Sequence, residues 1–146
     1  LLGEWIFGFD ICQQVCPWNI RFASNNNVLD EFSFASEHAP SQLIDELMLS
    51  PQAFNRKFND SPVKRAKRRG YLRNITIALG NRGNIEAVPA LKVALNDEEP
   101  LVRSHAAWAL GQIGGKTTWQ ALKEAHKGEQ DHQVQEEIQL ALEESR

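Results

Sequence analysis

The stretch that decides the fold is Ala78-Leu79-Gly80-Asn81-Arg82-Gly83, which returns 31 residues later as Ala109-Leu110-Gly111-Gln112-Ile113-Gly114. Each copy is followed by an apolar segment at helical spacing, first around Leu91 and then around Leu122. A helix pair of this period cannot bury both of its faces alone, so successive pairs stack as a solenoid. The repeat therefore predicts an all-α chain of stacked helix pairs.

Apolar residues extend this pattern toward the end of the sequence. A stripe recurs at helical spacing through Val102 and Ala106, and again through Val134, Ile138 and Ala141. We therefore expect about two and a half helical repeats after Tyr71.

The segment before the repeats carries signals for short helices. Ser50-Pro51 and Ser61-Pro62 each place a capping hydroxyl before a proline at the first helical position. We expect Ser41 to cap a further short helix. On the helix from Pro51, Phe54 and Phe58 lie one turn apart and are predicted core anchors. A basic helix is predicted over residues 62–69, with a break or bend at Gly70.

Basic charge is concentrated in one part of this acidic chain. Between Arg56 and Arg73 stand eight Lys or Arg residues against Asp60 alone, a net charge of +7, whereas the whole chain carries −3. The remainder therefore carries −10. Such segregation predicts a local site for a polyanion, such as the phosphates of a nucleic acid.

The only two cysteines lie near the start of the chain, in Asp10-Ile11-Cys12-Gln13-Gln14-Val15-Cys16-Pro17-Trp18-Asn19. In ferredoxin-type domains with two 4Fe-4S clusters, each ligand run ends in C-x3-C-P, and its last cysteine binds the other cluster. This spacing predicts iron–sulfur ligation by Cys12 and Cys16. The alternatives are a pair of inert buried thiols and, less favoured, a disulfide between them. Two thiolates cannot by themselves complete a four-cysteine site.

The run from Gly8 to Asn19 resembles the second cluster motif of epoxyqueuosine reductase, in which G-C-D-x-C-Q-x-x-C-P-W-N precedes HEAT-like repeats. The resemblance extends through Pro62 to Gly83 and on to Gly114, so it covers nearly the whole chain. Phe9 stands where the family has its first cysteine, and a phenyl ring cannot ligate iron. A cluster held by this motif would lack one ligand.

The motifs and the composition along the sequence predict a division of the chain into three parts. Residues 1–23 would be an irregular remnant of the ferredoxin-like cluster motif, residues 24–40 a linker, and residues 41–146 a HEAT-like solenoid that contains the basic helix 62–69. The chain does not begin with methionine, and we interpret it as the C-terminal part of a longer protein.

The family reduces epoxyqueuosine to queuosine in tRNA with cobalamin and 4Fe-4S clusters. The resemblance implies that Cys12 and Cys16 are cluster ligands, that Asp10 lies near the cobalamin, and that an upstream catalytic domain completes the enzyme. The chain alone is expected to be inactive and to bind neither cofactor, and no catalytic residue is assigned in it.

The basic run is interpreted as a contact for the tRNA anticodon stem-loop, because cations along a short helix can follow a phosphate backbone. A solvated helix face is the alternative. The predicted tRNA-binding residues are Lys64, Arg65, Lys67, Arg68, Arg69 and Arg73. Arg103, at the start of a repeat helix, is expected instead to tie adjacent repeats together.

Two other functions are compatible with the sequence. One is a helical-repeat scaffold for protein partners that has lost cluster binding, and the other is a different two-cluster electron carrier with appended repeats. No stretch is long enough to span a membrane, and no signal peptide is evident. We expect a cytoplasmic monomer.

Overall fold

The computed structural model describes residues 15–17 and 40–144. Within these ranges the chain forms helices joined by short turns, and no strand occurs there. The all-α prediction is therefore confirmed. The predicted cluster-motif remnant and linker lie almost wholly outside the described residues. The elements are α3 (Pro40–Leu47), α4 (Pro51–Lys57), η2 (Pro62–Ala66), α5 (Lys67–Arg82), η3 (Ile85–Ala87), α6 (Val88–Ala94), α7 (Pro100–Ile113), α8 (Lys116–Gly128) and α9 (His132–Glu144).

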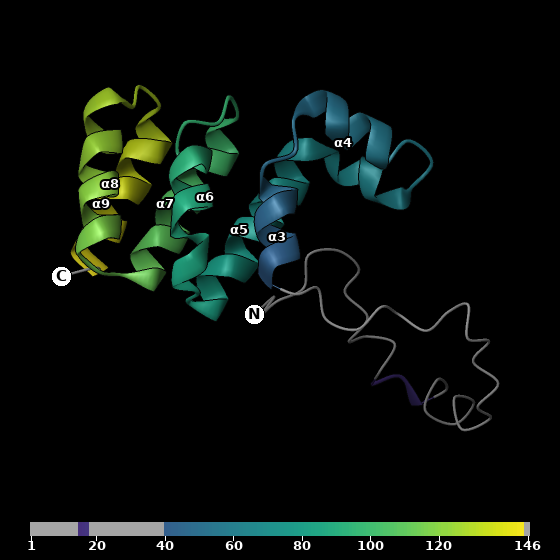
Figure 1. Cartoon of the computed structure of the whole chain (residues 1–146), viewed down its shortest axis with the longest axis horizontal. Helices are drawn as coiled ribbons and strands as arrows, with labels where there is room; N and C mark the ends of the chain where they lie inside the picture. The colour runs from purple at the N-terminus through teal and green to yellow at the C-terminus, as the bar shows by residue number, and fades with distance from the viewer. Residues whose placement is uncertain (1–14, 18–39, 145–146) are drawn as a thin grey trace.

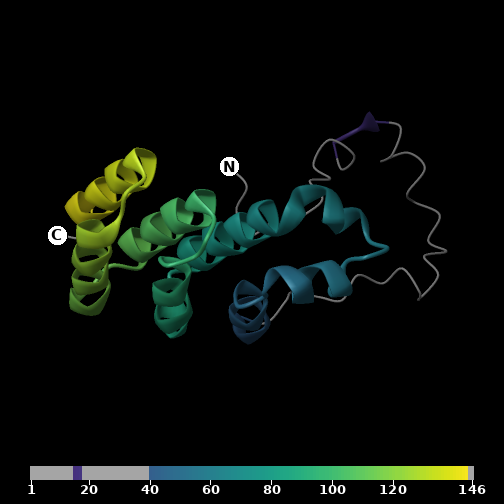
Figure 2. The ribbon, with the colours of Figure 1, turned by 90° about the horizontal axis from the view of Figure 1, so that it is seen from above.

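Helices α5 to α9 form the stack, which has two layers (Figures 1 and 2). Helices α5, α7 and α9 lie side by side in one layer, and α6 and α8 lie in the other. The chain thus forms the pairs α5–α6 and α7–α8, followed by α9 as the first helix of a third unit. The predicted two and a half repeats are confirmed. None of the described helices has the length and apolar character required to cross a membrane.

The core runs continuously between the two layers. Leu79 and Leu110, from the two copies of the repeated motif, are both fully buried, as is Leu122 from α8. Burial of each such side chain contributes about 1.5–3 kcal/mol relative to an exposed one. The predicted stripes also face inward, because Val102, Ala106, Val134 and Ile138 are buried. The core therefore follows the periodicity of the sequence closely.

The glycine of each repeated motif marks the closest approach of two neighbouring helices. A Cβ atom at Gly80 would lie 2.7 Å from Cζ3 of Trp108 and 3.0 Å from Cα of Ala109. A Cβ atom at Gly111 would lie 2.9 Å from Cβ of Ala141 and 3.0 Å from its Cα. The motif recurs because α5 meets α7, and α7 meets α9, at positions where there is no space for a side chain.

We expect Gly111→Ala to lower the free energy of unfolding by about 1–3 kcal/mol, because the added methyl group overpacks the contact between α7 and α9. Chemical denaturation followed by circular dichroism measures the change. Gly128→Ala is the matched control, since a Cβ atom there meets nothing within 4 Å. Equal effects of the two substitutions would contradict this explanation of the motif.

The helix starts before the stack are partly as predicted. Ser50 Oγ accepts a hydrogen bond from the backbone N–H of Ala53 at 3.2 Å, and Ser61 Oγ accepts one from Val63 at 3.3 Å. The prediction for Ser41 was wrong, because α3 already begins at Pro40 and Ser41 is its second residue. Proline at a first helical position needs no backbone N–H and starts the helix there.

Candidate nucleic-acid interface

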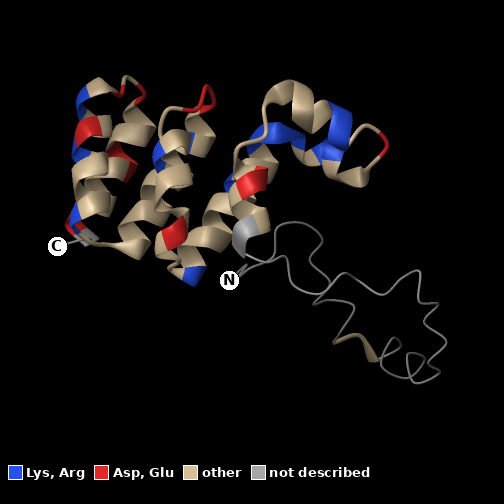
Figure 3. Ribbon diagram, viewed as in Figure 1, with Lys and Arg blue, Asp and Glu red and all other residues tan. Residues whose placement is uncertain are grey.

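Most of the concentrated basic charge lies on one projecting segment. We call residues 51–69 the arm: α4, η2 and the first residues of α5. Figures 1 and 2 show α4 and η2 extending away from the stack, and Figure 3 shows Lys and Arg gathered on them. The basic residues of the arm are Arg56, Lys57, Lys64, Arg65, Lys67, Arg68 and Arg69. Arg73 follows on α5, one turn beyond Arg69.

The predicted basic helix over residues 62–69 is not a single helix. A 3-10 helix covers Pro62–Ala66, and Lys67 then has φ 57° and ψ 164°, a backbone conformation that favours glycine. The chain bends there and enters α5, which passes through Gly70 without interruption. The break predicted at Gly70 therefore occurs three residues earlier. The bend separates the basic side chains that a continuous helix would have arranged along one axis.

Arg68 points into the fold, in contrast to the phosphate contact predicted for it. Its Nη2 and Nη1 atoms donate to the two carboxylate oxygens of Asp97 at 2.6 and 3.0 Å, and its Nε donates to the carbonyl of Leu49 at 2.7 Å. Only 16% of the Arg68 side chain is exposed. Bidentate pairing of this kind fixes geometry as well as charge. Arg68 therefore connects three segments of the chain: the α3–α4 turn, α5 and the α6–α7 turn.

Three other cations in the region have nearby partners. Lys64 Nζ donates to Asn59 Oδ1 at 2.9 Å, and Lys57 forms an ion pair with Glu46. The half-buried guanidinium of Arg73 donates to Asn74 Oδ1 at 2.8 and 3.0 Å. Lys57 and Lys64 remain exposed, and their contacts resemble surface interactions that exchange readily with water.

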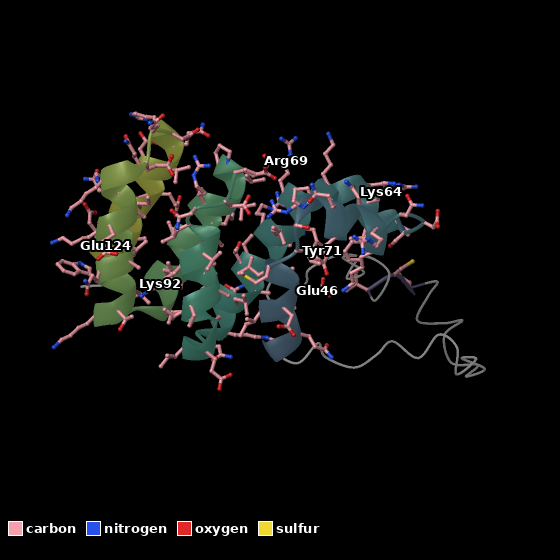
Figure 4. All side chains as sticks on the ribbon, turned by 45° about the horizontal axis from the view of Figure 1, so that its top comes forward. Glu46, Lys64, Arg69, Tyr71, Lys92 and Glu124 are labelled. Carbon is pink, nitrogen blue, oxygen red and sulfur yellow. The ribbon has the colours of Figure 1, made fainter. Side chains whose placement is uncertain are left out.

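The side chains of Arg65, Lys67 and Arg69 are exposed and make no hydrogen bond or ion pair with any residue in the described ranges. Figure 4 shows Arg69 pointing away from the ribbon into solvent. Cations arranged in this way can meet phosphate oxygens without first breaking an internal contact. The bend at Lys67 thus gives neighbouring residues opposite roles, with Arg68 directed inward and Lys67 and Arg69 outward.

Arg103 ties adjacent repeats together, as predicted. Its Nε and Nη2 atoms donate to the carboxylate of Glu129 at 2.7 and 2.9 Å, and its Nη1 donates to the carbonyl of Asp97 at 2.9 Å. In the next unit, Gln135 Nε2 donates to the carbonyl of Glu129 at 2.6 Å. Together with Arg68, these contacts form a ladder that links the turns of successive repeats. The role of Asp97 as a partner of arginine was not predicted from the sequence. Its signal was a second acidic residue, Glu129, 32 positions later in the corresponding turn.

The acidic members of the ladder have lowered pKa values. Burial is the largest influence on Asp97 and raises its pKa, but the hydrogen bond from Arg68, a backbone N–H and nearby cations together lower the pKa below its ordinary value. For Glu129, the hydrogen bond from Arg103 has the largest effect. This bond and two further hydrogen bonds from backbone N–H groups outweigh the effect of burial, and together they lower the pKa of Glu129 from 4.5 to about 2.

We expect Glu129→Gln to be less stable than the wild type at neutral pH, and the difference to shrink on acidification. Because the pKa of Glu129 is lower in the folded state than in the unfolded state, its contribution is full above about pH 4.5 and is lost as the pH falls toward 2. Urea denaturation at several pH values measures this. Glu143→Gln, on the exposed side of α9, controls for the loss of one negative charge. A difference independent of pH between 2 and 7 would contradict the assignment.

The predicted cluster ligands are only partly within the described residues. Cys16 is half-buried and forms no disulfide, whereas Cys12, Asp10 and Phe9 lie outside these residues. No group of three or more His, Cys, Asp or Glu side chains in the described ranges is arranged to hold a metal ion. One thiolate does not make a four-cysteine site. The described residues therefore do not form a complete iron–sulfur site.

A polar hollow of about 610 Å³ lies between α6 and α8. Lys92 stands on one side and Glu124 on the other, and both are marked in Figure 4. Asp97, Arg103 and Glu129 also line it, already engaged in the ladder. The hollow is thus a gap between two outer helices, bounded by structural ion pairs, and lies in the stack rather than on the arm.

Comparison with known proteins gives consistent matches. The family described as HEAT repeats matches residues 67–143. An epoxyqueuosine reductase from Xanthomonas campestris pv. campestris is 36% identical over 114 residues, which cover 77% of this chain and 32% of that protein. One from Staphylococcus aureus is 32% identical over 138 residues, covering 94% of this chain and 35% of that protein. The chain spans about a third of the length of these relatives.

A solved structure extends the similarity to three dimensions. The crystal structure of epoxyqueuosine reductase with a tRNA-Tyr epoxyqueuosine-modified stem loop matches with a TM-score of 0.78 and 26% identity, covering 98% of this chain and 38% of that chain. The structural similarity therefore includes the arm as well as the stack.

Proposed function

Because the chain belongs to the HEAT-repeat family, we propose that its stack is the helical-repeat part of an epoxyqueuosine reductase and that its arm binds a tRNA stem loop. Two lines of evidence support the first part: relatives of this name match over most of the chain, and the fold is similar to that of a solved epoxyqueuosine reductase. The reaction assigned to the whole protein is the reduction of epoxyqueuosine to queuosine in tRNA.

The observation that carries the RNA proposal is the exposure of Arg65, Lys67 and Arg69 on one projecting segment, without partners among the described residues. Each phosphate that these cations neutralise releases condensed counterions. The logarithm of the binding constant therefore falls linearly as the logarithm of the salt concentration rises. A folded stem loop presents closely spaced phosphates, which suit a small group of cations at fixed positions. Lys64 and Arg73 lie close to this group and complete the proposed contact surface.

The remaining parts of the proposal concern the cluster motif, of which only Cys16 lies within the described ranges, and domains outside this chain. Cys12 and Cys16 would supply two ligands to 4Fe-4S clusters, and Asp10 would lie near cobalamin in the upstream catalytic domain. The clusters supply electrons when bound, and the residues of this chain would hold the RNA in place. Because Phe9 stands where the family has a cysteine, the cluster ligands that Cys12 and Cys16 do not supply would come from other parts of the whole protein. We place the whole protein in the cytoplasm as a monomer.

Direct binding tests the RNA proposal. Fluorescence anisotropy with a labelled anticodon stem loop, at 50 to 300 mM salt, should show binding whose affinity falls steadily as the salt concentration rises. Absence of binding at 50 mM salt would overturn the proposal and favour a protein-binding scaffold. A duplex DNA of equal length is the control for purely non-specific attraction.

A cellular experiment tests the reaction. Deletion of the gene that encodes this chain, followed by mass spectrometry of nucleosides from total tRNA, should reveal accumulated epoxyqueuosine and lost queuosine. Restoring the gene on a plasmid should reverse both changes. Unchanged queuosine in the deletion strain would contradict the assigned activity, and would do so independently of the binding result.

A further inference from the structure

We propose that Phe58 and Tyr71 are positioning residues, which together with Phe54 fix the arm so that its cations meet several RNA phosphates at once. This inference rests on the proposed RNA binding and adds an uncharged determinant to it. None of the three aromatic side chains carries a charge, so none of them neutralises a phosphate. An effect of their loss on the salt dependence of RNA binding must therefore act through the placement of the cations.

The three rings form one compact cluster. The ring centroids of Phe54 and Phe58 are 5.0 Å apart, those of Phe58 and Tyr71 are 5.0 Å apart, and those of Phe54 and Tyr71 are 5.7 Å apart. The planes are tilted by 48° to 60°, the range of edge-to-face and tilted contacts that aromatic pairs prefer. Every ring thus contacts the other two, and loss of one removes two of the three contacts.

This cluster is separate from the core of the stack. Phe54 is only 2% exposed, yet it does not belong to the continuous core that runs through the stack. Tyr71 is the link, because it packs against that core and also against both phenyl rings. Small satellite clusters of this kind hold a projecting segment in place. The direction of the arm therefore depends on the contact of two phenylalanines with one tyrosine on α5.

Polar contacts at the same place support this geometry. The Tyr71 hydroxyl donates to Glu46 Oε2 at 3.2 Å, and the other oxygen of Glu46 pairs with Lys57 on α4. Figure 4 shows Glu46 and Tyr71 next to each other. Burial, followed by the charge of Glu46, raises the pKa of Tyr71, so the phenol keeps its proton and remains a donor. Glu46 thus connects α3, α4 and α5.

The cations of η2 have no comparable anchor of their own. No residue of Pro62–Ala66 is buried, and this short helix carries both Lys64 and Arg65. Its link to the cluster is the turn after α4, in which the backbone N–H of Ser61 donates to the carbonyl of Phe58 at 3.2 Å. If the Phe58 ring is removed, the arm should sample several directions. Arg65 would then no longer hold a fixed distance from Lys67 and Arg69.

The test is Phe58→Ala, assayed for stem-loop affinity across a range of salt concentrations. We expect roughly tenfold weaker binding at low salt, and a salt slope smaller by roughly 0.7 to 1.8, which corresponds to one or two lost phosphate contacts. Phe58→Tyr keeps the ring and should restore both values. Leu142→Ala, which removes a partly buried side chain from α9 far from the arm, controls for general loss of stability.

Three outcomes are decisive. A reduced slope with Phe58→Ala, rescued by Phe58→Tyr, supports the proposal. Wild-type affinity and slope in Phe58→Ala overturn it. A loss of affinity that follows only the unfolded fraction, with the wild-type salt slope, also overturns it, because Leu142→Ala is expected to show that same behaviour. The triple variant Arg65→Glu/Lys67→Glu/Arg69→Glu separates the two claims. If the triple variant also binds like the wild type, the claim that the arm binds RNA fails. If only the triple variant is weakened, the positioning role alone fails.

Discussion

The triple variant Arg65→Glu/Lys67→Glu/Arg69→Glu is expected to bind a tRNA stem loop roughly 100-fold more weakly than the wild type at 50 mM salt. The three side chains are exposed and make no contact that the fold needs, so the substitutions should leave the unfolding midpoint nearly unchanged. Each reversal removes one favourable phosphate contact and adds a repulsive one. Fluorescence anisotropy measures the affinity, and circular dichroism confirms the fold.

The control must carry the same change in net charge at another place. Lys116, Lys123 and Lys127 are exposed on α8, in the part of the stack remote from the arm (Figure 1). Their replacement by glutamate should weaken binding several-fold at most, through the overall field of the protein. Equal losses in the two triple variants would mean that net charge, rather than the arm, governs binding.

Arg68→Ala is expected to destabilise the fold by about 3 kcal/mol, because it leaves the nearly buried carboxylate of Asp97 without its partner. Only 10% of the Asp97 side chain is exposed, and the lost guanidinium also served the carbonyl of Leu49. A melting point lower by roughly 10 °C is the corresponding result for a domain of this size. Differential scanning calorimetry measures both quantities.

Arg68→Lys shows whether the stability that Arg68 contributes depends on its hydrogen-bond geometry or on its charge alone. A lysine retains the positive charge but cannot reproduce the two parallel hydrogen bonds to Asp97 together with the bond to Leu49. We expect this variant to lose a large part of the stability that Arg68→Ala loses. Full stability in Arg68→Lys would show that charge alone suffices, and an unaffected Arg68→Ala variant would contradict the structural role of Arg68 altogether.

The repeated architecture was predictable from the sequence because it rests on local periodicity. The recurrence of Ala-Leu-Gly at Gly80 and Gly111 indicated the repeat, and the structure adds that each of these glycines lies at a close approach between two helices. The caps at Ser50 and Ser61 also depend only on residues within three positions. Patterns that depend on the nearest turn or two of the chain are visible without knowledge of tertiary contacts.

The details of the arm were not predictable in the same way. Lysine rarely adopts positive φ, so no local signal places the bend at Lys67 instead of at Gly70. Arg68 and Arg69 are identical in type and adjacent, and they are distinguished by tertiary contacts of Arg68 with Leu49 and with Asp97, 19 and 29 residues away. The acidic positions Asp97 and Glu129 are 32 residues apart, within one residue of the 31-residue period of the repeats, and this recurrence could have indicated internal partners for arginine. The roles proposed for Cys12 and Asp10 stay predictions, because these residues lie outside the described ranges.

The most direct test of the account compares Arg68→Ala with Arg69→Ala in one set of experiments, because the same substitution is made at adjacent positions. Stability is measured by calorimetry, and stem-loop affinity is measured at 50 mM salt and corrected for the folded fraction. We predict that Arg69→Ala lowers affinity several-fold with unchanged stability, whereas Arg68→Ala lowers stability and leaves the affinity of the folded protein nearly intact. The reverse pattern, or an unchanged affinity in Arg69→Ala, would contradict the division of the arm into one structural arginine and exposed phosphate-binding cations.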